Sequence, residues 1–219
     1  MSQENLKLRR LATGHLTQFI EAAIHSILLA RCVYPQSNIV TKRRFGICVR
    51  LCAESVIRKY VANFLTSLRV AMLDDRIHAI WILIKDECDT SARERFVVEV
   101  PHDFARTLFH EKNSIGDQTE LELACKAARI LSEAYRGLER RLGLVREPPI
   151  SEPKWELFVD IKQPAVGADM LDVPIGCTLL EETDENMQRD ATNLVRLPLK
   201  SSSVNDKVLL STYVDIAER

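Results

Sequence analysis

The sequence has little glycine, and this scarcity argues against one large group of functions. Only seven of its 219 residues are glycine, and none stands in a G-x-G-x-x-G or G-x-x-x-x-G-K-[ST] pattern. Such patterns supply the backbone N–H groups that cradle phosphates in dinucleotide- and nucleotide-binding enzymes. The usual phosphate-binding signals are therefore missing, and we expect no cofactor.

The chain also lacks an excess of charge of either sign. Thirty Lys and Arg residues stand against 31 Asp and Glu residues, which leaves a net charge of -1 at pH 7. Without a general positive field, affinity for nucleic acid or for an anionic membrane would need a local basic patch. We therefore expect neither direct nucleic-acid binding nor a membrane partner.

The cysteines do not form a metal-binding pattern. Cys48 and Cys52 are spaced C-x-x-x-C, but no second Cys or His pair stands at a zinc-ligand spacing, so packing is favoured over metal. We interpret all six cysteines as free thiols in a reducing compartment: Cys32, Cys48, Cys52, Cys88, Cys125 and Cys177. No local signature of a Cys/His nucleophile is present, and no catalytic residue is predicted.

Residues 15–35 carry the strongest helical pattern in the chain. Apolar side chains recur there at steps of three and four, namely Leu16, Phe19, Ile20, Ala23, Ile24, Ile27 and Leu28. A membrane span needs about 20 nearly uninterrupted apolar residues, so this pattern predicts a core helix of a water-soluble domain. We expect Pro35 to mark its exit, residues 1–12 to be frayed or a lead-in, and Thr13 to be a candidate cap.

Two further helices are predicted. Residues 53–73 repeat apolar side chains at helical spacing, and Asp117 and Glu120 have the spacing of a capping box. The third helix would carry an apolar stripe and end at Gly143: Leu121, Ala124, Cys125, Ala128, Leu131, Tyr135, Leu138 and Leu142.

Several segments have the pattern of strands. Residues 77–85 are apolar on both faces, as a covered central strand is, and residues 93–100 return beside them as a hairpin. Residues 154–161 alternate, and residues 39–47 predict two short extended pieces around a basic turn. The last quarter has strands but no helix and is expected to wrap over the sheet. The order predicts an α+β domain with helices on one face of a mainly antiparallel sheet.

Four sequence runs together resemble the HORMA domain. They are FIEAAIHSILLARCVYP from residue 19, IVTKRRFGICV from residue 39, Arg58-Lys59-Tyr60, and FVVEV from residue 96. Within that family the chain is most similar to the branch of mitotic-arrest-deficient-like accessory subunits of translesion DNA polymerase zeta. The resemblance implies three long helices on the sheet, a HORMA core over residues 1–162 and a C-terminal safety belt over residues 163–219.

The same resemblance implies a non-catalytic adaptor. Such a protein traps a closure-motif peptide of the polymerase zeta catalytic subunit under its belt, and bridges it to the C-terminal domain of a second translesion polymerase. The implied setting is DNA damage tolerance in the nucleus. Further implied partners are a second HORMA domain and a remodelling ATPase of the AAA+ class.

Site residues also follow from the resemblance. Tyr60 and Phe64 would contact the closure peptide, and four belt residues would meet the second polymerase: Leu197, Pro198, Ser211 and Tyr213. Lys42, Arg43 and Arg129 would lie at a self-association surface. From the residues alone, the simplest reading of the basic turn Lys42 to Arg44 is a solvated loop.

Two other functions stay open on the sequence alone. One is a spindle-checkpoint adaptor of the same fold with a different closure peptide, and the other is a small thiol-dependent enzyme. His25 and His78 are interpreted as satisfied core or boundary residues rather than as ligands.

Overall fold

The first helix is longer than the sequence pattern predicts. The computed structural model describes residues 3–86, 93–109, 119–145, 153–161, 178–179, 194–204 and 207–217. Helix α1 spans Gln3–Ala30, so Thr13 lies buried within it and is not a cap. The early turns are held by tertiary contacts, because Ala12 is buried and Arg9 donates a hydrogen bond to the Leu73 carbonyl at 3.2 Å.

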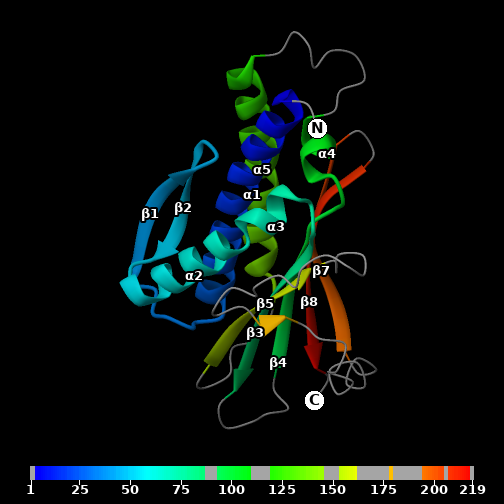
Figure 1. The fold of residues 1–219 in the computed structure, drawn as a ribbon. Helices are drawn as coiled ribbons and strands as arrows, with labels where there is room; N and C mark the ends of the chain where they lie inside the picture. Colours follow the sequence, from blue (N-terminus) through cyan, green and yellow to red (C-terminus); the bar gives the residue numbers. More distant parts are fainter. Residues whose placement is uncertain are drawn as a thin grey trace.

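A six-stranded sheet forms the second layer, with strand order β6-β5-β3-β4-β8-β7 (Figure 1). The strands are β3 (Ile77–Asp86), β4 (Arg93–Glu99), β5 (Pro153–Ile161), β6 (Thr178–Leu179), β7 (Leu194–Val204) and β8 (Lys207–Ala217). All neighbouring pairs are antiparallel except β5 with β6. The predicted mainly antiparallel sheet is therefore confirmed.

Strand β3 is central and buried on both faces, as predicted. Ile80 and Ile82 face the helices, Ala79 and Leu83 lie on the opposite face, and all four are buried. The interpretation of His78 as a core or boundary residue is wrong, since its side chain is 56% exposed and its Nδ1 atom lies 3.1 Å from Asp160 Oδ2. The pairing of β3 with β5 is irregular between Ile77 and Ala79, and this bulge turns the His78 side chain to solvent although the strand is central.

The helices gather on one face of the sheet. Besides α1 they are α2 (Ser55–Ser67), α3 (Arg69–Leu73), α4 (Phe104–Phe109) and α5 (Glu120–Leu142). The predicted helix over residues 53–73 is thus two helices that meet at Leu68. Three long helices, α1, α2 and α5, agree with the predicted fold class. In the described part of the chain, no helix has both the length and the apolarity needed to cross a membrane.

Helix α5 begins differently from the prediction. Its capping box is formed by Thr119 and Glu122, and Asp117 lies outside the described residues. The buried stripe therefore passes through Leu123 and Ala127, whereas Leu121 is 73% exposed. Leu131, Tyr135, Leu138 and Leu142 are buried as predicted. The helix ends at Gly143, which keeps a right-handed φ of -68°.

The predicted pair of short extended pieces is the hairpin β1 (Ile39–Arg44) and β2 (Ile47–Cys52), which Figure 1 shows beside α1 and away from β7 and β8. Its turn is Phe45-Gly46, so Lys42 and Arg43 lie on β1 rather than on a turn. Phe45 has a φ of 34° and is buried between Phe19 and Tyr135, with ring centroids 6.4 and 5.6 Å away.

The C-terminal hairpin belongs to the sheet and does not wrap over it. Strand β8 pairs with β4 from Ser211 to Ile216, and β7 forms the edge beyond it. The burial of Leu210 and Val214 explains this, since both join the core beneath the helices. Residues 163–177, 180–193, 205–206 and 218–219 of the predicted belt lie outside the described residues, and the boundary at residue 162 stays a prediction.

Candidate functional site

The outer side of β5 is paired with a described strand over only part of its length. On its inner side β5 pairs with β3 along its whole length, whereas β6 pairs with its outer side only at Phe158 and Val159. Within the described ranges, no other strand borders that outer side. The remaining N–H and C=O groups of a strand edge can bind another extended chain.

An apolar wall of α2 stands beside this edge. Tyr60 is 38% exposed, and its ring contacts Trp155 of β5 edge-to-face, with centroids 5.3 Å apart. Val56, one turn earlier on α2, is 76% exposed. Phe64 is buried one turn later, so it supports the wall from within the core. Sequence reasoning missed Trp155 as a site residue, although the alternation over residues 154–161 places it on the same face as the buried Leu157 and Val159.

Three of the four residues predicted for a second partner share one face of the sheet. Tyr213 pairs with Val97 and Ser211 with Glu99 on the face of the sheet opposite the helices, and both are half-buried. Pro198 pairs with Tyr213 and is exposed, but Leu197 pairs with Val214, a residue of the helix-facing side. Directly paired residues share a face. The register therefore joins Pro198, Ser211 and Tyr213 on one face.

An ion pair fixes the strands around Tyr213. Arg95 donates two hydrogen bonds to Asp215 Oδ2, from Nε at 3.2 Å and from Nη2 at 2.7 Å, and Asp215 is almost fully buried. The same guanidinium lies over the Trp81 ring, 4.7 Å from its centroid. Planar stacking and two charge-assisted hydrogen bonds hold β3, β4 and β8 in register on this face.

The three cations predicted for self-association lie on neighbouring elements. Lys42 and Arg43 are exposed on β1, and Arg129 is exposed on α5. The hairpin touches α5 through Phe45 and Tyr135. Arg129 precedes Tyr135 by six residues, which is about 9 Å along a helix. The structure therefore places these residues near the junction of the hairpin and α5.

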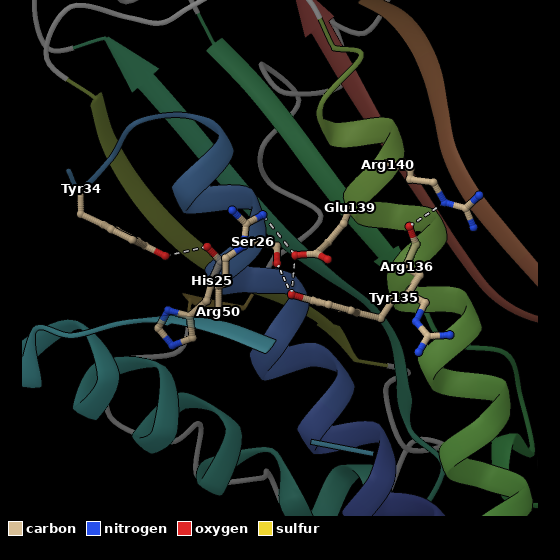
Figure 2. Close-up of polar contacts among 8 residues, drawn as sticks. All are labelled: His25, Ser26, Tyr34, Arg50, Tyr135, Arg136, Glu139 and Arg140. Atoms are coloured by element: carbon tan, nitrogen blue, oxygen red, sulfur yellow. Dashed lines mark hydrogen bonds and ion pairs between the residues drawn. The ribbon is translucent and has the colours of Figure 1, made fainter. Parts of the chain in front are cut away.

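A polar cluster joins α1, β2 and α5 (Figure 2). Ser26 Oγ lies 2.8 Å from Tyr135 Oη, and Tyr135 donates to Glu139 Oε1 at 2.9 Å. Arg50 Nη2 donates to the same carboxylate oxygen at 3.3 Å. Burial raises the pKa of Tyr135, so its hydroxyl remains a proton donor.

The histidine and cysteine side chains do not favour a thiol enzyme or a metal site. His25 is fully buried, and burial lowers its pKa to about 4. Cys52, whose backbone N–H faces His25 Nδ1 at 3.5 Å, is buried and has a raised pKa, the opposite of an activated thiol. Cys32, Cys48 and Cys125 are exposed free thiols, so Cys48 is not packed, and Cys88 and Cys177 lie outside the described residues. The described residues contain no cluster of three or more side chains suited to a metal.

Comparison with known sequences finds relatives over part of the chain. It is 24% identical over 85 residues to the mitotic spindle checkpoint component mad2 of Schizosaccharomyces pombe, and 22% identical over 100 residues to the mitotic spindle assembly checkpoint protein MAD2B of Gallus gallus. These matches cover 39% and 46% of this chain. They cover 42% and 47% of the relatives, so the chain spans about half the length of the curated relatives that it matches. No protein-family model matches the chain.

Solved structures match nearly the whole chain. A chain of the mitotic checkpoint complex has a TM-score of 0.61 at 17% identity, covering 94% of this chain and 99% of that one. HTP-2 of C. elegans, solved bound to the HIM-3 closure motif, has a TM-score of 0.54 at 11% identity, covering 91% and 87%. The HORMA fold and the similarity to MAD2B predicted from the sequence are thus confirmed.

Proposed function

We propose that this chain is a non-catalytic HORMA adaptor that holds an extended closure-motif peptide against the outer edge of β5. We further propose that the peptide comes from the catalytic subunit of polymerase zeta, and that the adaptor joins it to a second translesion polymerase during DNA damage tolerance in the nucleus. The similarity to MAD2B supports this choice of partner. The structural likeness to HTP-2 bound to the HIM-3 closure motif supports a peptide-binding role.

The observation that carries the proposal is that, among the described strands, only β6 pairs with the outer side of β5, at Phe158 and Val159, and that Tyr60 stands beside this edge. An added strand would hydrogen-bond to the β5 backbone, and every second side chain would face α2. There it would meet the exposed side chains of Val56 and Tyr60 and the half-buried ring of Trp155. The backbone supplies affinity without sequence preference, and this surface selects apolar side chains at alternate positions of the peptide.

The topology supports a role for the C-terminal region as a belt. Strands β5 and β7 lie on opposite sides of β3 and β4, so the chain between residues 161 and 194 has to connect two separate parts of the sheet. In this proposal it closes over a peptide bound at β5. Release of the peptide then requires the belt to open, so exchange is slow compared with binding to an open groove.

The second polymerase would bind the opposite face of the sheet, at Tyr213, Ser211 and Pro198. The Arg95–Asp215 ion pair holds these strands in one geometry, which lowers the entropy lost when a partner binds. Because Tyr60 lies on the helix side and Tyr213 on the other, the two partners can be bound at the same time.

A second candidate is a spindle-checkpoint adaptor that traps a different closure peptide. It is supported by the similarity to mad2 of S. pombe and by the structural likeness to a chain of the mitotic checkpoint complex. Both candidates use the same β5 edge, so the identity of the tightest-binding peptide separates them.

Calorimetry with two reciprocal variants tests the proposal. The ligands are a closure peptide of the polymerase zeta catalytic subunit, a spindle-checkpoint closure peptide and the C-terminal domain of a second translesion polymerase. Tyr60→Ala should weaken binding of the polymerase zeta closure peptide by about 2 kcal/mol, roughly 30-fold in Kd, and leave binding of the polymerase domain unchanged. Tyr213→Ala should do the reverse.

Circular dichroism first establishes that both variants fold. Equal loss of both ligands in each folded variant would show one contiguous site and contradict the two-face proposal. Tighter binding of the checkpoint peptide by the unmodified protein would select the second candidate.

A further inference from the structure

A pocket of about 190 Å³ lies where α1 and α5 end, away from the β5 edge. Leu29, Ala30 and Leu142 give it apolar walls, and Arg50 of β2 and Glu139 stand at one side. Cys32 lies at its rim and is exposed. None of these residues takes part in the proposed peptide or polymerase sites.

The charges around the pocket favour a cation. The C-terminal ends of α1 and α5 both meet there, and each contributes about half a negative charge. Glu139 adds a full negative charge inside the pocket, and among the described residues Arg50 is the only cation that lines it. The two cations in the last turn of α5 are directed elsewhere, since Arg140 Nε donates to the Arg136 carbonyl at 3.3 Å and Arg141 Nη1 to the Pro198 carbonyl at 3.2 Å. In Figure 2, Arg136 and Arg140 point away from the Glu139 carboxylate.

Arg50 holds its place weakly. Its contact with Glu139 Oε1 is 3.3 Å long, and the two side chains are 56% and 29% exposed. Exposed ion pairs of this kind contribute little to stability. By contrast, Tyr135 fixes the carboxylate from the buried side through its 2.9 Å hydrogen bond. The anion is thus fixed in position, whereas its cationic partner can leave.

We propose that this pocket is a second recognition site, which takes the cationic head of a lysine or arginine side chain from a partner protein. The volume is below the roughly 300–1,000 Å³ of pockets for drug-sized ligands, so it suits one side chain. The aliphatic stem would lie against Leu29, Ala30 and Leu142, and the head would displace Arg50 from Glu139. Arg50 then acts as an internal occupant of the site in the free protein.

The reactivity of Cys32 tests whether the electrostatic potential at the pocket is negative. The full chain is treated with a cationic (trimethylammonium-ethyl) and an anionic (sulfonato-ethyl) methanethiosulfonate, and each cysteine is followed by mass spectrometry. Rates are divided by those of a free cysteine peptide. Cys32 should prefer the cationic reagent about fivefold or more, whereas the exposed Cys48 and Cys125 serve as internal controls.

Two substitutions link that preference to the pocket. Glu139→Gln should remove the preference of Cys32 for the cationic reagent, because the carboxylate is lost. Arg50→Ala should increase this preference, because Arg50 no longer competes with the reagent for Glu139. A Cys32 preference equal to that of Cys48 and Cys125, or unchanged in Glu139→Gln, would overturn the proposal.

A second experiment tests recognition of the side chain itself. Nα-acetyl-lysine methylamide is titrated into the Arg50→Ala variant and followed by amide NMR, with the norleucine compound as a control of similar stem but no charge. Saturable shifts are expected at residues 29–32 and 142–143 with the lysine compound only. Equal shifts with norleucine, or none with lysine, would overturn the proposal.

Gly143→Leu provides a steric control for the titration. Gly143 lines the pocket, its φ of -68° suits any L residue, and an added Cβ would meet nothing closer than 3.5 Å. The variant should therefore fold, and combined with Arg50→Ala it should lose the shifts because leucine fills the pocket. Shifts that persist in this folded variant would place binding elsewhere and contradict the proposal.

Discussion

The hydroxyl of Tyr135 is predicted to be the main polar link between α1 and α5. It lies in a fully buried side chain and contacts Ser26 Oγ and Glu139 Oε1. Because the carboxylate can only accept, Tyr135 donates to Glu139 and Ser26 donates to Tyr135. Tyr135→Phe removes this one oxygen and keeps the ring that packs on Phe45.

The expected cost follows from the groups left behind. Losing a hydrogen bond to a charged group costs about 1.5–3 kcal/mol, and the buried Ser26 hydroxyl loses its partner as well. We therefore expect Tyr135→Phe to lower the free energy of unfolding by about 3 kcal/mol and Ser26→Ala to lower it by about 1 kcal/mol. The double variant should lose about 1 kcal/mol less than the sum of the two single losses, because both substitutions remove the same Ser26–Tyr135 hydrogen bond.

Urea unfolding followed by circular dichroism measures all four proteins, and an unchanged m-value shows that the differences are in stability. A Tyr135→Phe cost below about 0.5 kcal/mol, or strict additivity in the double variant, would refute the assignment of this hydroxyl as a buried link.

Two other perturbations test the core and its pH dependence. Phe45→Ala empties the space between Phe19 and Tyr135 and should cost about 3–5 kcal/mol in urea unfolding, and a cost near 1 kcal/mol would contradict its place in the core. Burial lowers the pKa of His25 from 6.5 to about 4, so below pH 6.5 the unfolded chain binds a proton that the folded one does not. The free energy of unfolding should therefore fall by up to about 3 kcal/mol as the pH decreases from 6.5 to 4. In His25→Gln this contribution to the pH dependence should be missing. The same pH dependence in both proteins would contradict the assignment.

Long, uniform patterns predicted the fold well, and element ends depended on tertiary contacts. The apolar run at 77–85 predicted β3 because few other arrangements cover both faces of such a run. The charged start of α1 gave no such pattern, since its helix depends on the burial of Ala12 and on the Arg9–Leu73 hydrogen bond. On α5, one capping residue sets the register, and the pattern alone favoured Leu121 over Leu123 for burial.

The face on which a site residue lies can be predicted from the sequence only where regular strand alternation determines it. Alternation from the buried Val214 places Tyr213 on the face opposite the helices. The register of β7 against β8 is irregular between Pro198 and Lys200, and a shift of one residue moves a side chain to the other face. The pairing of Tyr60 with Trp155 joins residues far apart in the chain, so no local pattern reveals it.

Hydrogen exchange of the β5 backbone tests the central claim most directly. The full chain is labelled for seconds with and without a saturating closure peptide of the polymerase zeta catalytic subunit, and the fragment containing Pro153–Ile161 is compared with the one containing Arg93–Glu99. Strand β4 is already paired on both sides and serves as the internal control. We predict slower exchange in β5, no change in β4, and loss of the effect in Tyr60→Ala. A peptide that binds and leaves the exchange of β5 unchanged would contradict strand addition at this edge.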